Sequence, residues 1–469
     1  MNKPLFIPLT LAATLLVSGC AMLEPTLPEA KPAVPANWPL PPTTAQSATS
    51  QATPAAADIG WRDFFTDPKL KELIARALDN NRDLRVAVLN VERARALYRV
   101  QRASQFPALN ATINETRTGG NVATPGSVYT ASVGASFELD LFGRVHNLNN
   151  AALQQFFAQE EARRSAQLAL IGEIAGAYLS LAADMESQKV AQATLDSQRK
   201  AYDLIVKRHN AGAVSALDLM QAQTTVESAR ADLARYTGLV ATDTNALRLL
   251  LGAPLEDKLL PTSFDLAVSG IAPLPAQLPS EVLLRRPDVL QAEHLLRSAN
   301  ANIGAARAAF FPSITLTGGI GSASTELSGL FKTGTQFWNF VPQITLPIFQ
   351  GGRLTANLDA ATADRDIALA RYEKSIQAGF REVADALALT GTLAERRAAQ
   401  QSLTQAAERA YTLSKARYDQ GRDSFLSLLD AQRSLYAAQQ GLVAAQLAEQ
   451  NNRVALYKVL GGGWEEKSK

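Results

Sequence analysis

The chain is poor in residues that hold metals. Its 469 residues include one cysteine, three histidines and four methionines. One cysteine cannot form an internal disulfide, and one thiolate cannot build a zinc or iron–sulfur site. His146, His209 and His294 have no metal-ligand partner at a suitable spacing, and four methionines give no support to a methionine-lined copper path. The sequence therefore predicts no metal centre and no cofactor.

Motifs of common enzyme classes are also missing from the sequence. It has no G-x-x-x-x-G-K-[ST] motif for a nucleotide phosphate and no G-x-S-x-G motif for a serine hydrolase. The glycine-rich stretch TGGIGSA (317–323) lies in a strand pattern with no helix after it, so small strand residues explain it better. The formal net charge is +2 without a basic block, which argues against nucleic acid as a partner. We expect a protein that is not an enzyme.

Long apolar runs are absent after residue 20, so we expect no transmembrane helix there. The apolar content of 47% is nevertheless ample for a folded core. Strands of a membrane β-barrel alternate over about 10 residues and do not show in a hydropathy profile. The sequence is thus compatible with a membrane β-barrel.

The single cysteine has an informative position. Residues 1–19 carry a positive charge, an apolar run and then small residues, which is the layout of a secretory signal peptide. LVSGC (16–20) resembles a lipobox, which implies a thioether-linked diacylglycerol and an acylated amine on Cys20. An ordinary signal peptide is the alternative. Three acyl chains anchor a protein stably, and Ala21 is not the aspartate that usually retains such lipoproteins in the inner membrane, so we expect anchoring in outer-membrane lipid.

An internal repeat organises the rest of the chain. RHNAGAVSALDLMQAQ (208–223) aligns without gaps with RYDQGRDSFLSLLDAQ (417–432), 209 residues further on. Upstream, Pro107 matches Pro312 at a spacing of 205, and the segment ELDLFGR (138–144) matches TLPIFQGGR (345–353), with Phe142 opposite Phe349. The boundaries that follow are a proline-rich tether at 20–57, a first repeat at 58–252, a connection at 253–277, a second repeat at 278–461 and a tail at 462–469.

Each repeat has the same order of predicted elements. In each repeat a helix, of about 35 residues near Asp67–Ser104 and shorter in the second copy, precedes two strand-like stretches. These two stretches are predicted to form a β-hairpin, at about 106–141 in the first repeat and at about 312–349 in the second. A long proline-free segment follows, and its 64 residues in the first repeat make a helical rod of roughly 96 Å. A turn and a second helix end each repeat. Leucines on a seven-residue grid in the last helix, such as Leu428 and Leu435, predict left-handed supercoiling.

The strand-like stretches alternate apolar and polar residues. In SVYTASVGASFELDL (127–141), Tyr129 and Val133 share one face, and Thr130 and Ser132 share the other. Such a strand is either half-buried on a soluble core, or it faces lipid on one side and a lumen on the other. The signal peptide and the aromatic residues near strand ends favour the second interpretation. Small barrels have about eight strands, so four strands require several protomers to close a barrel.

These features together resemble the TolC-like outer membrane factor family, specifically the OprM-type lipoproteins of drug efflux systems. The motifs that carry the resemblance, besides the lipobox, are DIGWRDFFTDPKL (58–70), ELDLFGR (138–144), RRPDVLQAEHLL (285–296), AARAAFFPSI (305–314) and LLDAQRSLY (428–436). The resemblance implies a mixed α+β membrane protein. Each chain of a homotrimer would give four strands to one outer-membrane β-barrel, which a long periplasmic α-helical barrel with an equatorial domain would continue.

The resemblance also implies a function. The chain would be the exit channel of a tripartite multidrug efflux pump, with a periplasmic membrane-fusion adaptor and an inner-membrane transporter of the resistance–nodulation–division (RND) type as partners. A duct for type I protein secretion is the nearer alternative. A periplasmic coiled-coil structural lipoprotein is the alternative from another class, but it does not explain the duplicated strand pairs with apolar faces.

Two turns between long helices are the predicted docking sites for the adaptor. HNAGAVSAL (209–217) and YDQGRDSFL (418–426) break helical patterns at a glycine, which suits a left-handed helix end, and each has a serine that suits the cap of the next helix. The docking residues are Gly212, Ala213, Ser215, Gly421, Arg422 and Ser424. A capping turn without a partner is the alternative.

A gate is predicted just inside the second turn, where Leu426 and Asp430 lie one helical turn apart and share a face. The resemblance implies that both point into the pore, where three copies form a leucine ring and a carboxylate ring that favours cations. It also implies that Arg417, Tyr418 and Asp423 hold the inner hairpin closed through polar links to its neighbours. The alternative is coiled-coil core for Leu426 and a solvated charge for Asp430.

Overall fold

A computed structural model describes residues 23–35, 38, 59–121, 126–262, 264 and 280–462. The predicted signal peptide, Cys20, most of the tether, most of the 253–277 connection and most of the tail lie outside these residues. The chain divides into two compact units, which we describe separately. Unit 1 comprises residues 1–32, 89–161 and 290–375, and unit 2 comprises residues 33–88, 162–289 and 376–469.

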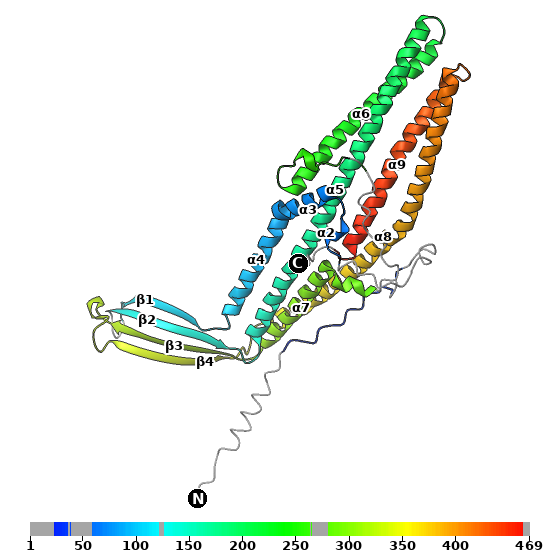
Figure 1. Ribbon diagram of the computed structural model, residues 1–469. Coiled ribbons are helices and arrows are strands. Elements are labelled where there is room, and N and C mark those ends of the chain that lie inside the picture. The colour runs from blue at the N-terminus through cyan, green and yellow to red at the C-terminus, as the bar shows by residue number, and fades with distance from the viewer. Residues whose placement is uncertain are drawn as a thin grey trace. The chain divides into compact units, whose positions relative to one another are not determined.

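Unit 1 contains a four-stranded antiparallel sheet in the order β1-β2-β3-β4 (Figure 1). The strands are β1 (Ala108–Thr118), β2 (Gly126–Leu139), β3 (Ser313–Ser324) and β4 (Gln336–Thr345), so each predicted hairpin has its two strands. A 3-10 turn, η6 (Leu327–Gly329), lies between β3 and β4. Because β2 pairs with β3, the sheet joins the first half of the chain to the second, and β1 and β4 remain as its edges.

One face of the sheet is apolar and open. Ala111, Val133, Ile320 and Trp338 lie directly opposite one another across the four strands, so they form one row on one face. Trp338 is 77% exposed and Ile320 is 68% exposed in the single chain. Exposed large apolar side chains in one patch mark a surface that another apolar phase covers. This exposure contradicts strands half-buried on the chain's own core.

The prediction of one continuous helix near Asp67–Ser104 is wrong. The structure has two helices there, α3 (Pro68–Asn80) and α4 (Arg82–Ala103). Asn81 lies between them, and its side chain is buried. Its Oδ1 accepts a hydrogen bond from Leu84 N at 2.9 Å, and its Nδ2 donates to Leu250 O at 2.8 Å. An Asn that caps the next helix favours extended backbone at its own position, so it ends α3 and starts α4.

Four long helices make up most of the rest of the chain. They form two hairpins, α5 (Arg144–Asn210) with α6 (Ala216–Leu251) and α8 (Arg353–Asp419) with α9 (Phe425–Val459) (Figure 1). α5 and α8 have 67 residues each, or about 100 Å of helix at 1.5 Å per residue. α7 (Pro287–Ala308) precedes β3, and the short elements α2 (Trp61–Phe64), η3 (Asp257–Leu259) and η5 (Ser280–Arg285) complete the described chain.

One window of α5 is apolar and long enough to cross a membrane by composition alone, although no such helix is predicted from the sequence. Within the structure 56% of that window is buried. Apolar side chains of α5, among them Ile171 and Ile174, pack in the core of unit 2. The core explains this composition, since a helix buried on several faces has no long polar stripe.

The core of unit 2 gathers around an aromatic stack. The rings of Phe64 and Tyr457 lie 3.7 Å apart at an angle of 12°, and Phe65 packs edge-on against Phe64. The fully buried side chains around them include Trp61, Leu70, Leu73, Ile74, Ile174, Leu181, Leu247 and Leu251, from α2, α3, α5 and α6. This core joins the middle of α5 to the ends of α6 and α9 that lie away from the turns, and the turns carry the predicted site residues.

Candidate functional site

The two hairpin turns have nearly the same backbone. Gly212 and Gly421 adopt φ angles of +73° and +71°, in the left-handed region where a side chain is strained. Ala213 N donates to Arg208 O at 2.8 Å, and Arg422 N donates to Arg417 O at 2.9 Å. These bonds close the ends of α5 and α8 in the same way, as expected for a glycine-terminated helix.

Serine caps start the following helices. Ser215 forms a capping box with Asp218, in which Asp218 N donates to Ser215 Oγ at 3.1 Å and Ser215 N donates to Asp218 Oδ2 at 3.2 Å. At the other turn Ser424 Oγ accepts from Ser427 N at 3.2 Å. The glycines and serines therefore have the local roles that the sequence predicts, while docking of an adaptor stays a prediction.

The ends of the two hairpins pack on each other within unit 2. Their small apolar cluster comprises Ile205, Ala222, Tyr418, Phe425, Leu428 and Leu429. Arg208 Nη1 donates to the Tyr418 hydroxyl at 2.9 Å, and the Arg208 guanidinium lies 5.3 Å from the Tyr418 ring centre. Tyr418 therefore links the second hairpin to the first. Sequence reasoning did not predict the role of Arg208, although its match with Arg417 across the repeat was a signal.

The other two predicted gate-link residues contact each other. Arg417 Nε donates to Asp423 Oδ2 at 2.7 Å, and Arg417 Nη2 donates to Asp423 Oδ1 at 3.0 Å. These hydrogen bonds lower the pKa of Asp423. The pair joins the last turn of α8 to the loop that follows it, so within this chain it stiffens one turn. Of the three predicted gate-link residues, Tyr418 is the one whose described side-chain hydrogen bond reaches the other hairpin.

The predicted gate residues lie on an open face of α9. Leu426 is 55% exposed and Asp430 is exposed, whereas Phe425, Leu428 and Leu429 beside them are buried. Residues four apart on a helix share a face, so Leu426 and Asp430 form one exposed strip. Leu426 therefore does not belong to the packed core of its own chain.

His209 has a structural partner. Its Nδ1 lies 3.2 Å from Val214 O, within the same turn. Among the residues that the structure describes, no three His, Cys, Asp or Glu side chains gather closely enough to hold a metal ion.

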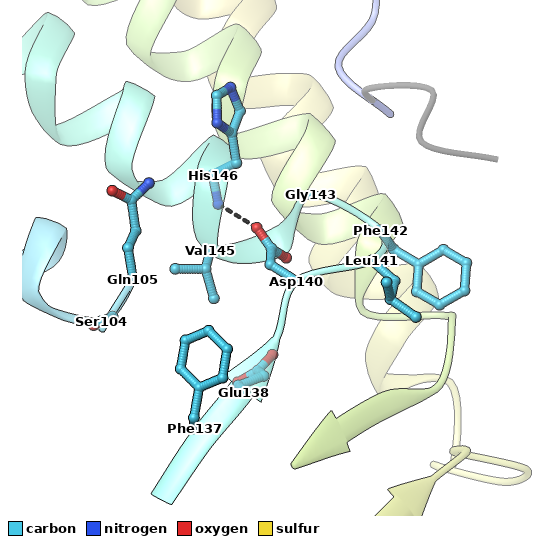
Figure 2. A pocket seen from close by; sticks show the side chains of 10 residues that line it. All are labelled: Ser104, Gln105, Phe137, Glu138, Asp140, Leu141, Phe142, Gly143, Val145 and His146. Carbon is cyan, nitrogen blue, oxygen red and sulfur yellow. Dashed lines mark hydrogen bonds between the residues drawn. The ribbon is translucent and has the colours of Figure 1, made fainter. Parts of the chain in front are cut away.

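A cavity of about 370 Å³ lies where β2 ends and α5 begins. Figure 2 shows Asp140 pointing at the backbone of His146, whose N–H donates to Asp140 Oδ2 at 2.7 Å. Arg144 forms a two-pronged ion pair with Glu138, at 2.6 Å and 3.0 Å. These contacts fix the passage from strand to helix, and a carboxylate beside the first turn also suits the helix dipole. The cavity therefore lies at the structural junction of α4, β2 and α5.

Two carboxyl groups face each other between α5 and α6. Burial, and then the neighbouring Asp243, raise the pKa of Asp184 from 3.8 to about 6. The folded protein thus binds more protons than the unfolded chain between pH 4 and 6, and stability is lost as the pH rises through this window. We expect Asp184→Asn to flatten this part of the plot of thermal midpoint against pH. Asp203→Asn, an exposed site on the same helix, is the control, and an unchanged slope in Asp184→Asn would contradict the prediction.

Comparison with protein families shows what this arrangement belongs to. A model of the outer membrane efflux protein family matches residues 73–253 and 278–462. The toluene efflux pump outer membrane protein TtgC of Pseudomonas putida is 46% identical over 98% of this chain and 96% of its own length. The outer membrane protein OprJ of Pseudomonas aeruginosa is 42% identical over 99% of this chain and 98% of its own length.

Solved structures show the same fold. The MtrE outer membrane channel of Neisseria gonorrhoeae, solved in an open state, matches with a TM-score of 0.84 and 40% identity, over 94% of this chain and 98% of that one. The CmeC outer membrane channel of Campylobacter jejuni matches with a TM-score of 0.85 and 26% identity, over 95% of this chain and 96% of that one.

Proposed function

The chain belongs to the outer membrane efflux protein family, and from this premise we propose that it is the outer-membrane exit channel of a tripartite efflux pump. It resides in the outer membrane of a Gram-negative cell. It conducts substrate passively, and it carries out no chemistry of its own. Names of relatives include an antibiotic and a toluene efflux pump outer membrane protein, so we propose small organic compounds as the substrates.

The observation that carries the proposal is the open apolar face of the sheet. A sheet with this face in water would expose Ile113, Val133, Ile320 and Trp338 together. Lipid covers such a face at no cost, and the opposite face, with Thr112, Ser132 and Asn339, suits a wet lumen. Four strands do not close a barrel, so we propose that three copies supply twelve. The helical hairpins of the three copies would then enclose the periplasmic part of the duct.

Conductance tests this function. We expect the purified protein to form a heat-resistant trimer in detergent and to open discrete channels in planar bilayers. Deletion of its gene should sensitise the cell to small organic toxins. A monomer that forms no channel would favour the structural lipoprotein. A channel whose loss affects export of one protein and no toxin would favour type I secretion.

The turns give the test for partners. We propose that both turns dock the periplasmic adaptor, which joins the channel to an inner-membrane RND transporter. Ala213→Cys and Arg422→Cys, both exposed, should cross-link to the adaptor in cells. Glu395→Cys is an exposed control, about 36 Å along α8 from its end, and should not cross-link. Failure at both turns while the pump remains active would contradict docking there.

Lipid on Cys20 is a separate proposal. We expect Cys20→Ser to lose all label from a clickable palmitate analogue, because acylation needs the thiol. The trimer should still insert, since the apolar face of the sheet supplies its own membrane burial. Label retained on Cys20→Ser would refute the lipid assignment.

A further inference from the structure

The two inner strands are joined by an aromatic stack at one end. Phe142 follows β2 and Phe311 precedes β3, and their ring centroids lie 4.7 Å apart at an angle of 18°. Figure 2 shows the Phe142 ring pointing away from the cavity residue Phe137. β2 and β3 pair through Leu139 and Ile314, and three residues beyond that pair the same register brings Phe142 opposite Phe311. The stack therefore continues the strand pairing past the end of the sheet.

The sequence repeat gives each of these rings a counterpart on an edge strand. Phe142 corresponds to Phe349, 207 positions later, and Phe311 corresponds to Phe106, 205 positions earlier. Phe349 follows β4, and Phe106 precedes β1. In the single chain Phe349 is 87% exposed and Phe106 is 61% exposed, against 41% for Phe311. Each edge of the sheet thus carries one half of an aromatic pair.

Shifting β2 residues by 207 positions and β3 residues by −205 positions converts the register between β2 and β3 into a register between the edge strands β4 and β1. The pair Leu139↔Ile314 becomes Leu346, the residue directly after β4, opposite Leu109 of β1. The pair of rings becomes Phe349 opposite Phe106. β1 and β4 run antiparallel, because each strand of the sheet is antiparallel to its neighbour, so the edges of two copies pair as β2 and β3 do.

The side-chain faces support this register independently of the aromatic rings. It places Ile344 opposite Ala111, both on the apolar face. It places Leu346 opposite Leu109 of the same face, if the alternation of β4 continues for one residue. It places the polar Thr345 opposite Asn110, on the other face. A slip of one residue would set Leu346 against Asn110 and turn apolar side chains into the lumen. A slip of two residues keeps the faces but separates the two rings.

We infer that β4 of one copy of this chain pairs with β1 of a second copy in the register Leu346↔Leu109, and that Phe349 stacks on Phe106 of the second copy. The inference rests on the proposed trimeric channel and specifies how its barrel closes. The stack lies where the strands meet the helices, so it seals the subunit boundary at the same level as the stack within each chain.

Disulfide trapping tests the register. In a Cys20→Ser background the chain has no other cysteine, so Leu109→Cys with Leu346→Cys forms disulfides only between the new thiols. Directly opposite side chains have Cβ atoms about 4.5–5.5 Å apart, whereas diagonal ones lie about 7–8 Å apart. Disulfides form near the shorter distance. We expect several-fold more covalent dimer and trimer from this pair than from Leu109→Cys with Ile344→Cys, which is two residues out of register.

The outcomes separate the register from the proposed function. A detergent trimer that cross-links better through Leu109→Cys with Ile344→Cys would overturn the register and leave the channel intact. A protein that is not trimeric would overturn both. For the stack, Phe106→Leu and Phe349→Leu should each lower the trimer's dissociation temperature, and the double variant should lose no more than the larger single loss. The exposed Phe331→Leu is the control, and additive losses would overturn the stack.

Discussion

Gly252→Ala is expected to be the most damaging small substitution in unit 2. Gly252 ends α6 with a φ angle of +64°, which costs an L-residue about 1–2 kcal/mol. An added Cβ would also lie 2.4 Å from Asn80 O and 2.9 Å from Asn80 C, and both are backbone atoms that cannot swing away. Overpacking of this kind costs about 1–3 kcal/mol more. We expect a total loss of about 2–5 kcal/mol in the free energy of unfolding.

The control for this prediction isolates the clash. Gly212 also has a positive φ angle, but an added Cβ there meets nothing within 4 Å. Gly212→Ala should therefore show the backbone strain alone. The measurement is the thermal midpoint of far-UV circular dichroism in detergent, with the yield of folded protein beside it. Equal thermal midpoints for the two variants would show that the clash with Asn80 does not lower stability.

The sequence predicts the turns well because their chemistry is local. A glycine that ends one helix and a serine that caps the next act through bonds within about six residues, and the repeat shows the pattern twice. The same holds for the strand faces, since alternation fixes which side chains lie together. The break at Asn81 is not predicted, because its cap bond to Leu84 is local but its burial and its second bond, to Leu250 O, join residues that are distant in the sequence.

Contacts at the hairpin ends show the same limit. The resemblance implies that Arg417 and Asp423 link the inner hairpin to its neighbours, and within the single chain these two residues, six positions apart, bond to each other. Links from them to another copy stay a prediction. Arg208 bonds to Tyr418 across 210 positions, and periodicity alone does not show which partner it has. The sequence thus indicates which residues gather at the ends of the hairpins, and folding decides how they pair.

The exposed strip on α9 gives the sharpest comparison with its counterpart in the first repeat. Leu426 corresponds to Leu217, and both are largely exposed, at 55% and 66%. Asp430 corresponds to Gln221, so only the second hairpin presents a carboxylate. If the second hairpin lines the pore at its periplasmic end, three copies of Leu426 narrow it and three copies of Asp430 attract cations. The first hairpin would then have the same turn and an exposed leucine, but it would form no part of the constriction or of the carboxylate ring.

We therefore expect Leu426→Ala with Asp430→Ala to raise the resting conductance of single channels several-fold, because a narrow constriction dominates the resistance of the whole duct. Asp430→Ala alone should weaken cation selectivity, since it removes three charges from the mouth. The matched control is Leu217→Ala with Gln221→Ala, which makes the same change at the corresponding positions of α6 and should alter neither property. Recordings in planar bilayers measure both, with reversal potentials in a salt gradient for selectivity. Equal effects of the two double variants would place the constriction elsewhere, because a gate built by the second hairpin cannot respond equally to changes in the first.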